Sequence, residues 1–501
     1  MRNLKYIADC HYNQGNYAKA LSLYRYILQK SPADAAVLQA AGGCCLELKQ
    51  FSEAAVFYKA LVKKNPSAAN LVLLAAACYH DGRYEPAEKY LTRALQKDGD
   101  NYPGLVTFGN LCFMRKDYVR AFSFYRRAEK IAPAAPTVLI NLAKTCFEQR
   151  DYRRAEKYAL KARRLDSRSE TILTLLGNIS LEREDFAAAA AYFKSALKLK
   201  PGDGWLHNYL SRACQGEQIY DKALYHAWKA LELSGGEDSQ QLNFAYLLYE
   251  ILPSAPADSF KRYLRKWQKK YAGNPIVDYA LRAVNNSAET GRADPDYVRK
   301  IFDNFADGFE EVLASLNYKV PQYVDAFLQE FYPRPSWLGI RILDAGCGTG
   351  LCAPSLKKYA RFRSLDGVDL SEKMLRTAAG KKLYNRLFCA DLAEFVTRGK
   401  AAYHLIVAAD VLTYFGDLKN IFSGFCSTLK ERGRIIFSVT KNTHDKNDYF
   451  LHASGRFQHS KKYLKIVLEK SGFRIEKIVE KKLRNEGGKS VCGFIVSAVR
   501  T

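Results

Sequence analysis

A glycine-rich turn is the strongest chemical signal in this sequence. The short apolar segment 340–343 runs directly into Asp344-Ala-Gly-Cys-Gly-Thr-Gly350, and a helical stretch follows over 351–359. Glycines carry no Cβ atom, so backbone amides in such a turn can approach a ligand closely. The N-terminus of the following helix adds a partial positive charge. Strand, glycine-rich turn and helix in this order predict a cradle for a cofactor.

The spacing of these glycines argues against two common nucleotide sites. The glycines at 346, 348 and 350 read GxGxG and residue 351 is Leu, whereas a dinucleotide-binding turn reads GxGxxG. The chain also contains no GxxxxGK run followed by Ser or Thr, so a nucleoside-triphosphate loop is not expected.

Aspartates close the next three expected strands. Asp369 ends the segment 365–369, where a carboxylate can accept hydrogen bonds from both hydroxyls of a ribose. Asp391 and Asp410 end the two strands that follow. Each of the three could instead be a solvated strand end or could bond to a nearby backbone amide.

All these residues follow short apolar strands. The strand segments lie at 340–343, 365–369, 387–392, 403–410 and 434–439, with helical segments between them, which predicts an α/β domain. The succession resembles the class I S-adenosylmethionine-dependent methyltransferases, and the resemblance covers about 298–501. It implies a Rossmann-like, seven-stranded, mostly parallel sheet and S-adenosyl-L-methionine as the cofactor.

The resemblance also assigns residues to parts of the cofactor. Asp344 and the glycine turn would hold the methionine end, and Asp369 the ribose. Leu370 would lie against the adenine, Asp391 would receive its amino group, and Asp410 would line the site near the sulfonium. The full set expected to bind the cofactor is Asp344, Gly346, Cys347, Gly348, Gly350, Asp369, Leu370, Asp391, Leu392, Ala409 and Asp410.

His459 and Tyr414 are the candidate catalytic residues. Methyl transfer from a sulfonium is a displacement with a good leaving group, so an enzyme mainly supplies orientation and proximity. A nitrogen nucleophile must be neutral, and a general base would help to deprotonate it. His459 is the first candidate because histidine titrates near neutrality, with Tyr414 and Tyr463 as alternatives. His459 could instead make a structural hydrogen bond that orders its loop.

The first half of the chain repeats with a period of about 34 residues. Small residues allow two antiparallel helices to approach closely, and stacked helix pairs build a continuous core. The pattern resembles the tetratricopeptide repeat over about 1–235, in about seven units. The resemblance implies an all-α solenoid whose concave surface binds a protein or peptide. The alanines that carry the period stand at 20, 54, 87, 121, 155, 189 and 223.

Less regular sequence separates the repeats from the α/β part. We expect a degenerate repeat and a capping helix over 236–284, and a linker over 285–297, which is rich in small and polar residues. The segment 260–271 carries six basic and four aromatic residues. It is either a nucleic-acid or partner surface, or a solvated cap helix whose aromatic residues face the core.

The whole arrangement resembles a bacterial group of methyltransferases that carry tetratricopeptide repeats. The helical segment 302–318 and the segment 454–460 support this resemblance. In that group the leading helix covers the cofactor, so Phe309 and Tyr318 are candidate lid residues. They could equally be ordinary core aromatics.

Cysteine usage and charge limit the partners. Twelve cysteines without a CxxC pair indicate reduced thiols in a cytoplasmic protein and no metal site. Those at 10, 44, 78, 112 and 146 follow the repeat period and are expected to be small buried residues. The net charge of +25 permits a nucleic-acid, anionic-lipid or acidic protein partner, although no nucleic-acid motif occurs. No apolar run is long enough for a membrane span, and no secretory signal is expected.

These features together predict an enzyme with a recruitment module. The composition, 48% hydrophobic and 26% charged, is that of a globular chain. We expect a methyltransferase (EC 2.1.1.-) acting on a target, in the first place a protein, that the repeats recruit. The alternatives are a small-molecule methyltransferase of a biosynthetic pathway and an inactive cofactor-binding scaffold. The nearly intact cofactor motif argues against the scaffold.

Overall fold

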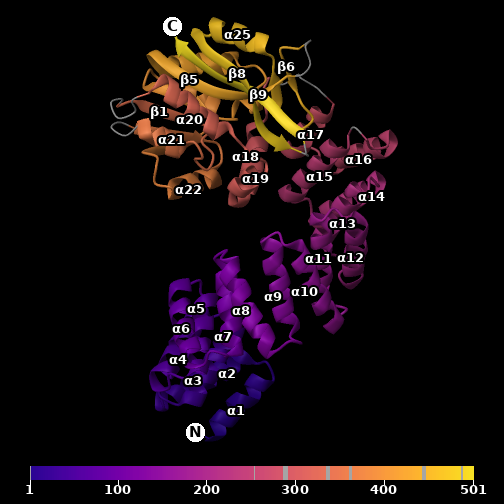
Figure 1. The fold of residues 1–501 in the computed structure, drawn as a ribbon, viewed down its shortest axis with the longest axis vertical. Coiled ribbons are helices and arrows are strands. Elements are labelled where there is room, and N and C mark those ends of the chain that lie inside the picture. The colour runs from indigo at the N-terminus through magenta and orange to yellow at the C-terminus, as the bar shows by residue number, and fades with distance from the viewer. Residues whose placement is uncertain are drawn as a thin grey trace. The chain divides into compact units, whose positions relative to one another are not determined.

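The structure is a computed structural model that describes residues 2–252, 254–285, 291–333, 339–359, 364–442, 447–486 and 489–501 (Figure 1). The chain divides into two compact units, Met1–Glu217 and Gln218–Thr501. The first unit contains helices only, and the second combines helices with one sheet.

Paired antiparallel helices form the first unit, and close helix contact explains the repeating small residues. Gly42 and Gly109 each face an aromatic ring of the second helix of their pair. A Cβ atom at either position would lie 2.4 Å from Cε1 of Tyr58 or Tyr125, so only glycine fits. The helices are α1 (Arg2–Asn13), α2 (Tyr17–Lys30), α3 (Ala35–Glu47), α4 (Phe51–Lys64), α5 (Ala68–His80), α6 (Tyr84–Lys97), α7 (Tyr102–Met114), α8 (Tyr118–Ile131), α9 (Pro136–Glu148), α10 (Tyr152–Leu165), α11 (Glu170–Glu182), α12 (Phe186–Leu199) and α13 (Gly204–Gly216).

The turn inside each pair has the same backbone conformation. One residue in it takes a positive φ, which ends the first helix of the pair. The alanines that carry the period are fully buried, as are most of the cysteines in step with them. The predicted all-α repeat array is therefore confirmed. The positive-φ turn residues are Gly15, Lys49, Gly82, Lys116, Arg150, Glu184 and Gln218.

Helices also open the second unit. The helix α16 buries the aromatic face of its basic segment through Phe260, Tyr263 and Trp267, which supports the cap-helix interpretation. Trp267 Nε1 donates a hydrogen bond of 2.6 Å to Gln241 Oε1 of the neighbouring helix. These helices are α14 (Tyr220–Leu233), α15 (Asp238–Ile251), α16 (Ala257–Lys270), α17 (Pro275–Val284), α18 (Pro295–Phe305), α19 (Phe309–Ser315) and α20 (Val320–Phe331).

The expected linker 285–297 is only partly a linker. Residues 286–290 lie outside the described residues. From Gly291 on, the chain is held against the α/β part: the Asp417 amide donates to the Gly291 carbonyl at 3.0 Å, and the Ala293 amide to the Tyr414 carbonyl at 2.8 Å. These backbone hydrogen bonds fix the approach to α18.

One twisted sheet forms the centre of the second unit. The order is β3-β2-β1-β4-β5-β7-β6, with β9 antiparallel to β5 and β8 antiparallel to β9. The strands β1 to β5 are parallel, which confirms the Rossmann-like α/β class. The sheet has nine strands among the described residues because the short strands β6 and β7 extend the seven expected. The strands are β1 (Arg341–Ala345), β2 (Ser364–Asp369), β3 (Arg386–Cys389), β4 (Tyr403–Ala408), β5 (Leu429–Lys441), β6 (Tyr449–Leu451), β7 (Phe457–His459), β8 (Phe473–Glu486) and β9 (Lys489–Arg500).

Helices cover both faces of the sheet. Ile342 packs with α20 and α21 (Ala353–Tyr359), whereas its neighbour Leu343 packs in the cluster that includes α24 (Lys419–Thr428) and α25 (Lys461–Lys470). Alternate residues of a strand point to opposite faces, so the unit has three layers. The chain reverses direction across the sheet between β1 and β4, and ligands of such sheets bind at the carboxyl ends of the strands at this point.

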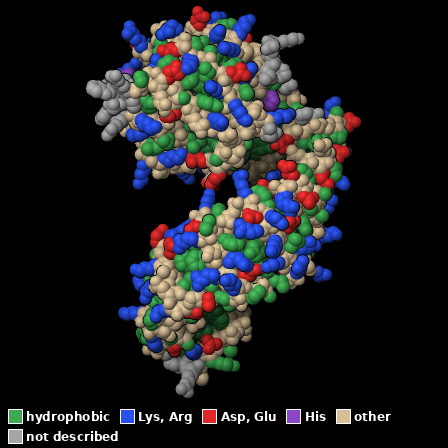
Figure 2. Space-filling view, viewed as in Figure 1, with side chains coloured by type: hydrophobic (Ala, Val, Ile, Leu, Met, Phe, Trp, Pro, Cys, Tyr) green, Lys and Arg blue, Asp and Glu red, His purple; other side chains and the backbone are tan. Residues whose placement is uncertain are grey.

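Lys and Arg side chains are scattered over the visible face and do not gather in one patch (Figure 2). Among the residues that the structure describes, no helix is long and apolar enough to cross a membrane.

Candidate functional site

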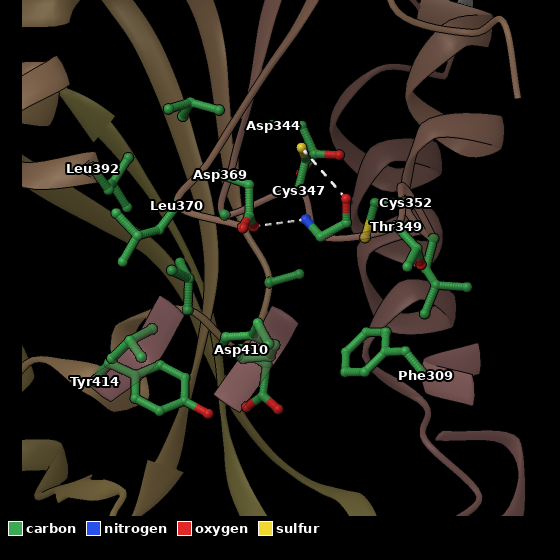
Figure 3. A pocket seen from close by; sticks show the side chains of 18 of the residues that line it. Phe309, Asp344, Cys347, Thr349, Cys352, Asp369, Leu370, Leu392, Asp410 and Tyr414 are labelled. Carbon is green, nitrogen blue, oxygen red and sulfur yellow. Dashed lines mark hydrogen bonds between the residues drawn. The ribbon is translucent and has the colours of Figure 1, made fainter. Parts of the chain in front are cut away.

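A pocket opens at the carboxyl ends of β1, β2 and β4 (Figure 3). The empty space within and in front of the pocket, open solvent included, is about 1210 Å³. The residues that line it include every predicted cofactor residue except Gly350, and also Tyr414, Phe309 and Tyr318. The structure thus brings together predicted residues that are up to 105 positions apart in the chain, from Phe309 to Tyr414.

Left-handed glycines build the turn after β1. Gly346, Gly348 and Gly350 have φ of +70°, +54° and +84°. A Cβ at Gly346 would lie 2.5 Å from the Val411 side chain, and one at Gly348 would project toward Phe309, 3.9 Å away. Gly350 is structural, since its Cβ position is 3.0 Å from the Tyr384 ring and it does not line the pocket.

Asp369 ties the end of β2 to this turn. Its carboxylate accepts hydrogen bonds from the Gly348 amide at 2.8 Å and from the Ser371 amide at 2.9 Å. A carboxylate can accept about four hydrogen bonds, so capacity remains for ligand hydroxyls. Burial raises the pKa of the Asp369 carboxyl, against the lowering effect of these amides.

Asp344 lies at the end of β1 and is almost fully buried. The Tyr384 hydroxyl donates a hydrogen bond of 2.6 Å to its Oδ2. Burial raises the pKa of the Asp344 carboxyl to about 7, although the Tyr384 hydroxyl opposes this shift. Tyr384 has no motif of its own in the sequence, so its support of Asp344 could not be predicted.

Asp391 is already paired. Its side chain forms an ion pair with Arg292, which comes from the expected linker. Its Oδ1 also accepts from the Glu394 amide at 3.1 Å and so caps the short helix α23 (Leu392–Thr397). A bond to a nearby backbone amide is the alternative that the sequence leaves open for Asp391, whereas no sequence pattern indicates the pairing with Arg292.

Asp410 belongs to a network of charged side chains. Arg484 Nη1 donates to Asp410 Oδ2 at 3.0 Å, and Arg484 Nε donates to Glu486 Oε2 at 3.1 Å. Arg456 Nη1 donates to the same Glu486 oxygen at 2.7 Å. Arg456 and Arg484 line the pocket together with Tyr414. Arg456 falls within a segment noted in the sequence, but Arg484 lies on β8 with no motif around it.

The structure overturns the predicted role of His459 as a general base. His459 is fully buried on β7, does not line the pocket, and its Nε2 lies 3.1 Å from the Gly416 carbonyl oxygen. Burial lowers the pKa of its imidazole to about 4. Tyr463 is also outside the pocket, where its hydroxyl donates to Asp417 at 3.0 Å. Because a base must reach its substrate, the structural interpretation of His459 holds and only Tyr414 remains in the pocket.

The burial of His459 has a consequence for stability. Its folded pKa of about 4 lies below the ordinary 6.5, so the unfolded chain binds the proton more tightly. The free energy of unfolding should therefore fall as pH drops from 6.5 toward 4, by up to about 3 kcal/mol. We expect a His459→Gln variant to lack this part of the pH dependence in denaturant titrations at pH 7 and 4.5. Equal pH dependence of the two proteins would show that His459 takes up its proton while folded.

Two helices cover the open side of the pocket. Phe302 of α18 contacts the Tyr414 ring at 5.6 Å between centroids and the Phe309 ring at 5.9 Å. An ion pair of 2.6 Å between Glu310 and Lys381 fastens α19 to the end of α22 (Glu372–Gly380). This arrangement favours the lid interpretation of Phe309.

Comparison with known proteins agrees with the fold and the pocket. A methyltransferase-domain family matches residues 316–478, and tetratricopeptide-repeat families match residues 11–78, 46–107 and 140–204. The chain therefore carries tetratricopeptide repeats in its N-terminal part and a methyltransferase domain in its C-terminal part.

Relatives of known name match short parts of the chain. Methyltransferase-like protein 27 of Homo sapiens is 35% identical over 117 residues, 23% of this chain and 47% of that protein. Malonyl-[acyl-carrier protein] O-methyltransferase of Priestia megaterium is 28% identical over 150 residues, 29% of this chain and 52% of that protein. A crystal structure of a SAM-dependent methyltransferase from Methanosarcina mazei is 20% identical, with a TM-score of 0.28 over 32% of this chain and 92% of that one. The chain spans about half the length of the curated relatives.

Proposed function

We propose that this protein is an S-adenosyl-L-methionine-dependent methyltransferase whose repeat array recruits the target, in the first place a protein. The observation that carries the proposal is the convergence of the glycine turn and Asp369 in one pocket at the strand reversal. Similarity to methyltransferases over 316–478 supports the same class.

The residues of the pocket suit this cofactor. The Asp369 carboxylate has remaining acceptor capacity for the ribose hydroxyls, and the glycine turn gives backbone amides access to the methionine end. Leu370 and Leu392 offer apolar surface for the adenine, and Asp391 stands beside them. Ala409 and Asp410 close the site at the end of β4. The bound cofactor supplies an activated methyl group on a sulfonium.

The chain itself supplies orientation and exclusion of water. The glycine turn and Asp369 fix the ligand, while Phe302 and Phe309 cover the pocket with aromatic rings. Holding two reactants in line contributes much of the acceleration of such displacements. Tyr414, the remaining predicted catalytic residue, lies at the acceptor side, where burial raises the pKa of its hydroxyl and keeps it protonated near neutral pH.

The repeats give the reason to favour a protein target. Tetratricopeptide arrays present a concave surface that suits a peptide or protein segment. The free cysteines suit a reducing compartment, for which we propose the cytoplasm. A small-molecule acceptor is the second candidate, because relatives include enzymes named for malonyl-[acyl-carrier protein] and for ubiquinone biosynthesis.

Methyl-labelled cofactor tests the proposal directly. The full-length protein would be added with the labelled cofactor to a lysate of a host that lacks the gene, and protein, RNA and small molecules would be separated. We expect label in a discrete protein band, since recruitment raises the local concentration of one target. Label confined to small molecules would favour the small-molecule acceptor over the protein target. Label in no fraction would contradict the proposed methyltransferase activity.

A further inference from the structure

Two arginines, Arg456 and Arg484, line the pocket together with Asp410 and Tyr414. Figure 3 shows the Asp410 carboxylate and Tyr414 together on one side, with Asp344 and Asp369 on the other. Arg484 contacts Asp410, and Arg456 shares a Glu486 oxygen with Arg484. We infer that the methyl acceptor carries a carboxylate, which docks on Arg456 and is itself methylated to an ester. This inference rests on the proposed methyltransferase function.

The arginine pair has donor capacity to spare. A guanidinium offers five N–H donors in a planar fork that matches a carboxylate. Within the described residues, Arg456 makes one ion pair, to the Glu486 oxygen that also serves Arg484. The Arg456 side chain is 26% exposed, whereas Arg484 is 2% exposed. Arg456 is therefore the arginine that a ligand can reach. Arg484 is buried and contacts the same Glu486 oxygen as Arg456.

The charged side chains differ between the glycine turn and the Asp410 side of the pocket. Asp344 and Asp369 lie at the glycine turn, where they complement a cationic donor. Beside Asp410, two arginines face two carboxylates. Arg484 pairs with Asp410 and with Glu486, and Arg456 pairs with the same Glu486 oxygen. Because both guanidiniums share one Glu486 oxygen, the N–H donors of Arg456 that Glu486 leaves unused can hold and orient an anionic group.

A carboxylate acceptor also needs no general base. An amine or hydroxyl must lose a proton to a base, whereas a carboxylate is already ionised at neutral pH. Among the described residues on the Asp410 side of the pocket, Tyr414 holds its proton because burial raises its pKa, and Asp410 is engaged by Arg484. His459, the expected base, lies outside the pocket.

The reaction then needs no proton transfer. A carboxylate oxygen attacks the methyl carbon, the new C–O bond forms as the C–S bond breaks, and the electron pair goes to sulfur. The products are a neutral thioether and a methyl ester. Arg456 holds the carboxylate by one oxygen and leaves the other free to attack.

The stability of the transferred label to alkali tests this inference. The labelled products of the full-length protein, formed in a lysate of a host without the gene, would be treated with dilute alkali and the volatile label collected. Methyl esters release labelled methanol, whereas N-methyl and ether products do not. We expect volatile label, and its recovery from the protein or the small-molecule fraction identifies the source of the carboxylate. Label that survives alkali overturns the inference and leaves the methyltransferase function intact.

Variants at Arg456 give an independent test. We expect Arg456→Gln to lower methyl transfer by about 10- to 100-fold, because a charge-assisted contact with the acceptor is lost. Its affinity for the cofactor in calorimetry and its unfolding midpoint should match those of the control Arg376→Gln, an exposed residue of α22. Arg456→Lys should restore part of the rate. Unchanged methyl transfer by Arg456→Gln overturns the inference. Failure of the wild-type protein to bind the cofactor would instead overturn the proposed function.

Discussion

Replacing Asp369 by Asn is expected to weaken binding of S-adenosyl-L-methionine by about 30-fold or more. A hydrogen bond to a charged acceptor is worth roughly 1.5–3 kcal/mol, and two ribose hydroxyls would lose such an acceptor. The carboxylate also receives the Gly348 amide at 2.8 Å, so the variant loosens the cradle as well. Calorimetric titration of the full-length protein with the cofactor measures the effect.

The control for this variant lies three residues further along the chain. Glu372 is on the exposed face of α22, with 68% of its side chain accessible, so Glu372→Gln changes the same charge without touching the pocket. Its cofactor affinity should equal that of the wild type. An Asp369→Asn protein with wild-type affinity and an unchanged unfolding midpoint would refute the assignment of Asp369 to the ribose.

Patterns that are local in sequence account for what could be predicted. The alanine period follows from the packing of each helix against its partner, and the glycine turn from backbone conformations that only glycine adopts easily. Asp369 was found because it ends a strand at a fixed distance after that turn. Each of these signals lies within one helix pair or one strand–turn–helix unit, so it can be recognised from a short stretch of sequence.

Contacts between distant segments could not be predicted in this way. Arg484 reaches Asp410 from 74 positions away, and Arg292 reaches Asp391 from 99 positions away. No periodicity links such pairs, because only the tertiary fold brings these segments together. His459 was misassigned for the related reason that a histidine looks the same in sequence whether it faces a pocket or the core.

The second compact unit also begins earlier than the 298–501 that resembles methyltransferases. Lys300 of α18 forms an ion pair of 2.8 Å with Asp238 of α15, and the Tyr279 hydroxyl of α17 donates to the Gly455 carbonyl at 3.1 Å. Gly455 directly precedes Arg456 and has a φ of +75°. Helices that the sequence placed with the repeats therefore support the loop that carries Arg456 into the pocket.

Replacing Gly346 by Ala should destabilise the β1 turn by about 2–5 kcal/mol. The φ of +70° costs an L-residue roughly 1–2 kcal/mol, and overpacking typically adds about 1–3 kcal/mol. The overpacking arises because the new Cβ would lie 2.5 Å from the Val411 side chain, whose residue lines the same pocket. Relief requires Val411 or the turn to shift, so cofactor affinity should fall together with stability.

Gly380 provides the matched control for this substitution. It ends α22, has no positive φ, and its Cβ position meets no atom within 4 Å, so Gly380→Ala should leave the turn unchanged. Hydrogen exchange of the amides in β1 and β4 measures the local free energy of opening in both variants. If Gly346→Ala exchanged like Gly380→Ala and bound the cofactor normally, the turn would not need its left-handed glycine. Faster exchange and weaker cofactor binding in Gly346→Ala would show that the cofactor site depends on this glycine. The reason is that the contact with Val411, which leaves no room for a side chain at 346, also forms part of the pocket wall.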